Sequence, residues 1–267
     1  MLRFFDTHAH LDLLGLKTEE TAQQLIANAQ LVGVEKILIP TIFAKDFEKI
    51  TAYSEPFSQQ LVYGFGLHPY FIEQHQKSDL DYLEKSLSNR NSQCVAIAEI
   101  GLDKRLAPEL WQKQCDFLVS QLEIAKQFNL PVSLHSVKTH SELYAFLNQA
   151  QLSQTGVIHA FNGSFQQAKN FVDLGYKIGV GGSITYPRAN KTRQAIAKLP
   201  LDALVLETDS PDMPIYQQQG KVNRPERIIE IFEVLCELRS ESREEIAEQI
   251  WQTSGQIFSD FYQKSDR

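Results

Sequence analysis

The stretch Lys36-Ile37-Leu38-Ile39-Pro40 places three consecutive apolar side chains between two longer polar segments. Successive side chains of a β-strand point to opposite faces of the sheet, so this run predicts a strand that is covered on both faces. Parallel sheets packed under helices have such strands, whereas an antiparallel sandwich alternates apolar and polar residues more regularly. The stretch therefore predicts an α/β protein with a parallel sheet.

Seven further apolar runs of this kind occur along the chain, separated by segments with helical periodicity. The clearest of these segments is 108–128, where Trp111, Cys115, Leu118 and Leu122 recur at spacings of three and four. Eight strand–helix repeats close a barrel, so the sequence predicts a (β/α)8 TIM barrel. The predicted strands are residues 3–6, 36–40, 61–67, 94–100, 131–135, 157–160, 176–180 and 203–207.

Two further helices are predicted after the last strand, over residues 224–239 and 243–262. Neither an internal repeat nor a linker rich in Pro, Gly or Ser interrupts the chain. A length of 267 residues is typical of one barrel. We therefore expect one domain over residues 1–267, with the additional C-terminal helices covering the barrel.

The composition is that of an ordinary globular protein, with 43% hydrophobic and 22% charged residues. The N-terminal residues show no apolar signal core, and no stretch approaches the length of a membrane helix. Cys94, Cys115 and Cys236 form no paired motif, so we interpret them as buried thiols in a reducing compartment. These features predict a cytoplasmic protein without membrane contact, and nothing indicates an obligate protein partner.

The formal net charge of −7 argues against a protein that coats duplex nucleic acid through counterion release alone. It does not argue against an anionic substrate at a metal site, because bound divalent ions add positive charge locally.

The first predicted strand ends in Asp6-Thr7-His8-Ala9-His10. Side chains two positions apart on an extended chain point the same way, so His8 and His10 can bind one ion together. Four more residues of metal-binding type stand at the ends of later strands, namely Glu99, His135, His159 and Asp209. The carboxyl ends of all barrel strands meet at one mouth, so the six side chains should converge there.

Imidazole and carboxylate ligands without thiolates suit zinc, magnesium, manganese, nickel or iron. Six ligands exceed what one catalytic ion with open positions needs, so we expect two divalent ions. Glu99 is the natural bridge between them in such a binuclear centre.

Seven ordered motifs resemble those of the TatD-type metal-dependent hydrolases, a family that includes deoxyribonucleases. Within this family, the motifs look most similar to those of the YjjV-like branch. The resemblance covers essentially the whole chain. The motifs are His8-Ala9-His10, Gly66-Leu67-His68-Pro69, Ala98-Glu99-Ile100-Gly101-Leu102-Asp103, Leu134-His135-Ser136, Ile158-His159-Ala160-Phe161-Asn162-Gly163-Ser164, Glu207-Thr208-Asp209-Ser210-Pro211-Asp212 and Asn223-Arg224-Pro225-Glu226.

The resemblance implies that the two ions have different ligand sets, which are His8, His10, Glu99 and Asp209 for one and Glu99, His135 and His159 for the other. It also implies that Asp209 takes the proton of the attacking water, a role that a carboxylate can perform.

One position departs from the family pattern. Val222 stands where a basic residue is often found, although Asn223 and Pro225 match. Arg224 or Lys221 can substitute, so the substrate contacts at this motif are open while the metal ligands are unaffected.

Residues outside the ligand set have more varied roles. His68 should face the mouth and contact the substrate or leaving group, and Asp103 should orient a metal ligand. His75 and His140 lie in helical or loop stretches, where solvated surface histidines are expected.

Basic residues also gather in the loops at the same mouth, which predicts a nucleic acid or another phosphate-bearing substrate. We expect Arg188 and Arg224 to contact it. The basic residues of these loops are Lys104, Arg105, Lys138, Arg188, Lys191, Arg193, Lys221 and Arg224.

These observations favour hydrolysis of a phosphodiester, with single-stranded DNA ends fitting a barrel mouth better than an intact duplex. The main alternative is hydrolysis of an ester or amide, such as an aminoacyl-tRNA or a lactone, because two ions polarise a carbonyl equally well. A non-catalytic metal-binding scaffold is a third alternative, disfavoured because Asp209 supplies a base.

Overall fold

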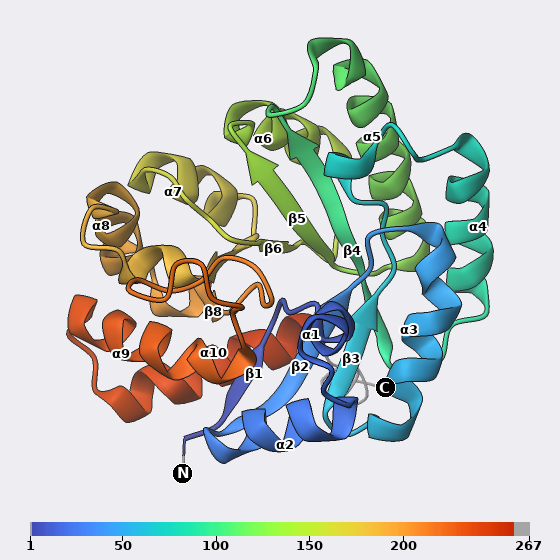
Figure 1. The fold of residues 1–267 in the computed structure, drawn as a ribbon. Coiled ribbons are helices and arrows are strands. Elements are labelled where there is room, and N and C mark those ends of the chain that lie inside the picture. Colours follow the sequence, from blue (N-terminus) through green and yellow to red (C-terminus); the bar gives the residue numbers. More distant parts are fainter. Residues whose placement is uncertain (1, 259–267) are drawn as a thin grey trace, which may run out of the picture.

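The eight apolar runs form eight parallel strands in one sheet, whose spatial order follows the chain from β1 to β8 (Figure 1). The computed structural model describes residues 2–258. The strands are β1 (Phe4–Asp6), β2 (Val34–Pro40), β3 (Leu61–Gly64), β4 (Cys94–Asp103), β5 (Val132–Val137), β6 (Gly156–Ile158), β7 (Lys177–Val180) and β8 (Leu204–Leu206). Every predicted strand is confirmed within a few residues at its ends.

The first and last strands are joined by backbone hydrogen bonds at the carboxyl end of the sheet. The Thr7 amide donates to the Leu206 carbonyl at 3.0 Å, and the Asp209 amide donates to the His8 carbonyl at 2.9 Å. The sheet is therefore a nearly closed TIM barrel, as the sequence predicts.

Helices surround the sheet, and α9 and α10 follow the last strand (Figure 1). They are α1 (Leu11–Thr18), α2 (Ala22–Leu31), α3 (Phe47–Ser54), α4 (Lys77–Ser88), α5 (Trp111–Phe128), α6 (His140–Ala150), α7 (Phe165–Asp173), α8 (Asn190–Lys198), α9 (Ile228–Leu238) and α10 (Arg243–Phe258). A 3-10 turn over Pro108–Leu110 precedes α5, because Pro fits the first turn of a helix. The predicted residues 259–262 of the last helix lie outside the described residues.

Strand β2 shows why its sequence is apolar on both faces. Ile37 and Ile39 belong to the large core that packs the sheet against the helices. Leu38, between them, belongs to a second core with Phe5 and Phe258, the last of which comes from α10. Both faces of the strand are therefore shielded from water, which explains why apolar and polar residues do not alternate along it.

Strand β4 extends further than predicted, to Asp103, and all of its residues are buried. The chain after β3 passes very close to it: a Cβ atom added to Gly66 would lie 2.5 Å from the Ala98 carbonyl carbon. Only glycine permits this approach, which brings the segment carrying His68 against the backbone of Glu99.

Cys94 and Cys115 are buried and Cys236 is half-buried, and all three are free thiols. Within residues 2–258, no helix is both long enough and apolar enough to cross a membrane.

Candidate metal centre

The six predicted ligands meet at the carboxyl ends of the strands. His8 and His10 follow β1, His159 follows β6 directly, and Asp209 lies three residues after β8. Glu99 and His135 belong to β4 and β5 themselves. All but Asp209 are less than a tenth exposed, and Asp209 is partly exposed.

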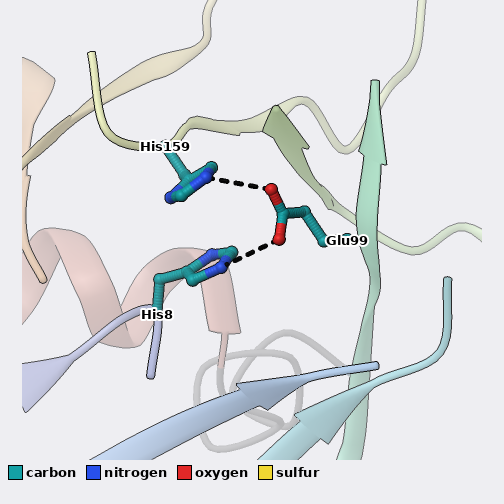
Figure 2. Close-up of side chains that lie close together, drawn as sticks. All are labelled: His8, Glu99 and His159. Carbon is teal, nitrogen blue, oxygen red and sulfur yellow. Dashed lines mark ion pairs between the residues drawn. The ribbon is translucent and has the colours of Figure 1, made fainter. Parts of the chain in front are cut away.

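Glu99 lies at the centre of this group, and its two carboxylate oxygens face different histidines (Figure 2). Oε2 lies 3.2 Å from His8 Nε2 and 3.8 Å from His10 Nε2. Oε1 lies 2.9 Å from both His135 Nδ1 and His159 Nε2. One carboxylate thus connects two pairs of histidines that come from opposite sides of the barrel mouth.

Asp209 completes the first side of the group. Its Oδ1 lies 3.8 Å from His8 Nε2, and the donor atoms of His8, His10 and Asp209 are close enough together to hold one metal ion. A second such group consists of His8, Glu99 and His159.

His68 lies closer to Glu99 than the sequence indicated. Its Nε2 is 3.2 Å from Glu99 Oε1, and its Nδ1 accepts a hydrogen bond from the Tyr70 amide at 3.0 Å. Together with Glu99 and His135 it forms a third group able to hold a metal ion. His68 thus joins the histidines around the central carboxylate, and its predicted contact with substrate stays a prediction.

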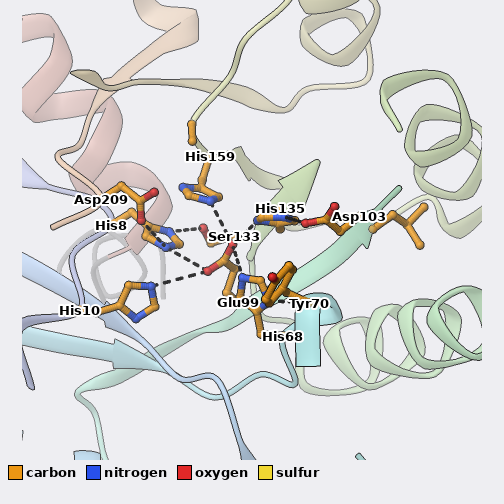
Figure 3. A network of polar contacts seen from close by, with 12 residues as sticks. His8, His10, His68, Tyr70, Glu99, Asp103, Ser133, His135, His159 and Asp209 are labelled. Atoms are coloured by element: carbon orange, nitrogen blue, oxygen red, sulfur yellow. Dashed lines mark hydrogen bonds and ion pairs between the residues drawn. The ribbon is translucent and has the colours of Figure 1, made fainter. Parts of the chain in front are cut away.

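A second ring of side chains contacts the histidines from behind (Figure 3). Asp103 Oδ2 lies 2.9 Å from His135 Nε2, so the aspartate contacts one of the histidines predicted to bind metal. Ser133 Oγ lies 3.1 Å from His8 Nδ1, and Glu207 Oε1 lies 3.6 Å from His159 Nδ1. Such partners fix the orientation of imidazole rings.

Ser133 and Glu207 were missed by the sequence reasoning. Ser133 stands two residues before His135, and Glu207 two residues before Asp209. Ser133 and His135 lie on one strand, where side chains at i and i+2 point to the same side, so this spacing was a signal that could have found Ser133. Glu207 and Asp209 lie beyond the end of β8, where this rule does not apply. Space for Glu207 comes from Gly179 on β7, where a Cβ atom would lie 2.5 Å from the Glu207 carboxylate.

The charges of the cluster are strongly coupled. Burial opposes ionisation of Glu99, but the imidazoles of His68, His159 and His8 outweigh it and hold its pKa well below the usual range. Burial, reinforced by the neighbouring charge of His159, holds the pKa of His8 well below its ordinary value. For His159 itself, burial is overcome by Glu99 and Asp209, so its pKa is raised.

Asp209 has the opposite tendency to Glu99. Burial raises the pKa of its carboxyl to about 6, with His159 lowering it and Glu99 raising it further. A carboxyl with a pKa near neutrality is well suited to accept and release a proton.

The ends of β1 and β8 are tied together beneath the cluster. Asp6, fully buried, accepts hydrogen bonds from the Thr208 amide at 2.9 Å and the Thr208 hydroxyl at 2.6 Å. Asn223, from the last sequence motif, donates to the Thr208 carbonyl at 2.7 Å. These contacts fix the backbone that carries His8 and Asp209.

The basic residues of the mouth differ in whether a carboxylate already pairs with them. Arg224 forms ion pairs with Glu20 at 2.6 Å and Glu226 at 3.1 Å. Arg188 is exposed, its guanidinium lies 5.3 Å from the centre of the Tyr186 ring, and no carboxylate of residues 2–258 pairs with it. Lys104 and Arg105 are also paired with carboxylates, those of Glu142 and Asp103 respectively.

The expected surface position of His75 is wrong. Its side chain is 1% exposed, and its Nε2 lies 3.0 Å from the His68 carbonyl oxygen. Phe43 and Phe117 cover the ring, with centroids at 5.5 and 6.0 Å. The 3-10 turn after His68 folds the segment inward, so His75 supports the backbone of a residue in the cluster.

The expected solvated surface position of His140 is also wrong. It is half-buried at the start of α6, where its ring lies 5.1 Å from that of Phe161. The aromatic residue that follows the end of β6 covers it.

Comparison with known proteins gives consistent relationships. The family model described as TatD-related DNase matches residues 5–259. An uncharacterized metal-dependent hydrolase of Haemophilus influenzae is 56% identical over 97% of this chain and 100% of its own. The uncharacterized metal-dependent hydrolase YjjV of Escherichia coli is 46% identical over 96% of this chain and 98% of its own.

The solved structure of the TatD homologue YjjV from Escherichia coli superimposes with a TM-score of 0.92 at 45% identity. It covers 96% of this chain and 98% of its own. The similarity therefore extends over the barrel and all the strand ends that carry the cluster.

Proposed function

The chain belongs to the family of TatD-related DNases and is a metal-dependent hydrolase, and we propose that it hydrolyses phosphodiester bonds of DNA at single-stranded ends, with two divalent ions. The observation that carries the proposal is the position of Glu99. Its Oε2 faces His8, and its Oε1 faces His135 and His159. A carboxylate that is shared between two sets of imidazoles has the arrangement of a bridge between two ions.

The donor atoms themselves support metal binding. His8 Nε2 is buried and has no hydrogen-bond partner among the described residues. Buried polar atoms are almost always hydrogen-bonded, so an unsatisfied imidazole nitrogen in this cluster indicates an atom available for a ligand. The rings of His8 and His159 also stack with centroids 3.8 Å apart, an unfavourable arrangement if both were protonated.

We assign His8, His10, Glu99 and Asp209 to one ion, and Glu99 with His135 and His159 to the second. When bound, two divalent ions would increase the acidity of the attacking water and stabilise negative charge on the leaving oxygen. The chain's own contribution is to hold both sets of ligands at fixed positions on rigid strand ends.

Asp209 is the proposed general base. Its side chain is 16% exposed, so water can reach it, whereas Glu99 at 2% lies beneath. Its carboxyl has a pKa raised to about 6, mainly by burial, so at neutral pH it is ionised and can accept the proton of the water.

His68, Arg188 and Arg224 are the proposed contacts to the substrate. Arg188 has no carboxylate partner among the described residues and can contact a phosphate directly. Arg224 is held by Glu20 and Glu226, so a substrate phosphate would have to compete with two carboxylates there. We expect Arg188 to contribute more.

The proposal covers residues 1–267 as one catalytic domain, which the packing of α10 against β8 and β1 supports. We also propose a cytoplasmic location, consistent with three free thiols.

The test is hydrolysis by the full-length, metal-reconstituted protein of single-stranded DNA, RNA, a small phosphodiester and a panel of esters, with Asp209→Asn as the control for contaminating nucleases. Release of nucleotides from DNA ends by the wild type alone supports the proposal. Hydrolysis of an aminoacyl-tRNA, a lactone or another ester without any phosphodiester would replace it with the carbonyl chemistry. Two bound ions without hydrolysis of any substrate would indicate a non-catalytic scaffold.

A further inference from the structure

A cleft of about 450 Å³ opens at the same mouth of the barrel as the candidate metal centre, between the loops that follow β6, β7 and β8. Its volume lies within the range of ~300–1,000 Å³ typical of small-molecule sites. The side chains that matter for its chemistry are Asn162, Tyr186, Arg188, Lys191, Met213 and Pro214.

The cleft belongs to the same mouth as the proposed ligands. Asn162 stands three residues after His159, and Met213 stands four residues after Asp209. In Figure 1 the orange loop that follows β8 runs beside α8 and the segment that precedes it. The loops that line the cleft therefore directly follow the strand ends that carry His159 and Asp209.

Hydrogen bonds between the loops hold the walls of the cleft in place. The Thr192 hydroxyl donates to Asn162 Oδ1 at 2.7 Å, which joins α8 to the loop after β6. The Tyr186 hydroxyl donates to the Pro214 carbonyl at 2.7 Å, which joins the loop before α8 to the loop after β8. The cleft is thus preformed, and binding does not have to order these loops.

The lining combines positive charge with aromatic and apolar surface. Arg188 and Lys191 are exposed, and within residues 2–258 neither has a carboxylate partner. The Arg188 guanidinium lies over the Tyr186 ring, 5.3 Å from its centroid, and the Tyr216 ring lies edge-on to it at 5.7 Å. Met213 is 42% exposed on the facing loop.

We propose that this cleft is the subsite for the nucleotide adjacent to the bond that is cleaved, with its base against Tyr186 and Met213 and its phosphate at Arg188 and Lys191. A phosphate alone would need the two cations but would leave the aromatic surface unused. A nucleotide uses both, because bases stack on aromatic rings and on arginine guanidinium planes. A base that is paired and stacked within a duplex has no free face for Tyr186, so the subsite should favour single-stranded ends.

This inference rests on the proposed phosphodiesterase function, but its test is binding rather than hydrolysis. The probe is thymidine 3′,5′-bisphosphate, which contains no diester bond, titrated calorimetrically into the metal-loaded full-length protein. Inorganic phosphate and thymidine are titrated in parallel. We expect the bisphosphate to bind at least about tenfold more tightly than either fragment.

Three variants locate the site. Tyr186→Leu removes the ring and should weaken binding of the bisphosphate about tenfold, as expected for a lost stacking contact. Tyr186→Phe keeps the ring but loses the hydrogen bond to Pro214, so it should retain most of the affinity. Lys191→Ala should weaken binding of the bisphosphate more than binding of thymidine. Lys198→Ala, at the other end of α8 and outside the cleft, should leave the affinity for both probes unchanged.

Equal affinity for phosphate and bisphosphate, or unchanged affinity in both Tyr186→Leu and Lys191→Ala, would overturn the subsite. Failure of the phosphodiesterase function would instead appear as no hydrolysis of bis(4-nitrophenyl) phosphate by the same metal-loaded sample, whatever the calorimetry gives.

Discussion

The two sides of Glu99 differ in what holds their histidines (Figure 3). On the β1 side, His8 is backed by the neutral hydroxyl of Ser133. On the side of β5 and β6, His135 is backed by Asp103 and His159 by Glu207, both carboxylates. A carboxylate behind an imidazole fixes the ring and increases its basicity, whereas a hydroxyl only fixes it.

If two ions bind as proposed, this difference implies that their two sites are unequal in character. The site on the side of β5 and β6 should hold its ion more firmly, because both of its histidines are carboxylate-backed. The site with His8, His10 and Asp209 has its own carboxylate among the ligands, and that carboxylate is the most exposed part of the cluster. We infer that an ion on the side of β5 and β6 would be mainly structural for the centre, and that the side with His8, His10 and Asp209 would handle the proton.

The largest expected effect comes from removing the group that both sides share. Glu99→Ala should abolish binding of both ions and all hydrolysis, because each set of histidines loses its common carboxylate. Elemental analysis of the purified variant measures the ions, and circular dichroism shows whether the barrel has folded. A folded variant that still carries two ions would break the comparison, since Glu99 would then not be the bridge.

The next effect concerns the β1 side alone. Asp209→Asn keeps the shape of the side chain and one oxygen but removes the anionic proton acceptor. If Asp209 is the base, kcat should fall by ~10²–10⁴-fold while KM changes much less. Both ions must be counted in the same sample. A near wild-type kcat with both ions present would exclude the base role, and loss of an ion would assign Asp209 to coordination.

A smaller effect should separate the two kinds of backing group. Asp103→Asn should lower the affinity for the ion on the side of β5 and β6 by about 10–100-fold, as is typical when the partner of a metal-binding histidine is lost. Ser133→Ala should lower the affinity for the ion on the β1 side much less. Competition with a chelator measures both affinities. Equal losses in the two variants would show that the nature of the backing group is unimportant here.

Residue type and position along the chain were sufficient to predict the barrel and the central cluster. Runs of residues that are apolar on both faces identify parallel strands. Histidines and carboxylates at the carboxyl ends of these strands converge, because all strands of the barrel end at one mouth. The position of Glu99 among His8, His10, His135 and His159 follows from the same rule, whereas the contact of His68 with Glu99 was not predicted.

Details that depend on side-chain packing were not predictable in this way. The burial of His75 results from the turn after His68 and from Phe117 on α5. The pairing of Arg224 with Glu20 joins residues 204 positions apart, and the sequence contains no pattern that indicates it. The charge of a residue can be read from a sequence, but whether a partner already neutralises that charge cannot.

The smallest effect extends the comparison from histidines to the arginines of the mouth. Within residues 2–258 no carboxylate pairs with Arg188, so Arg188→Ala should raise KM for a single-stranded oligonucleotide several-fold, the loss of ~1 kcal/mol expected for one exposed phosphate contact. The same change should leave KM for a small neutral ester unchanged. Arg224 is already paired with Glu20 and Glu226, so Arg224→Ala should affect KM less and should lower the melting temperature, because Glu20 loses its partner. Steady-state kinetics on both substrates, with thermal unfolding of each variant, separate these outcomes. A larger rise in KM for Arg224→Ala than for Arg188→Ala would show that the substrate displaces the carboxylates, and pairing would then not predict which arginine contacts phosphate.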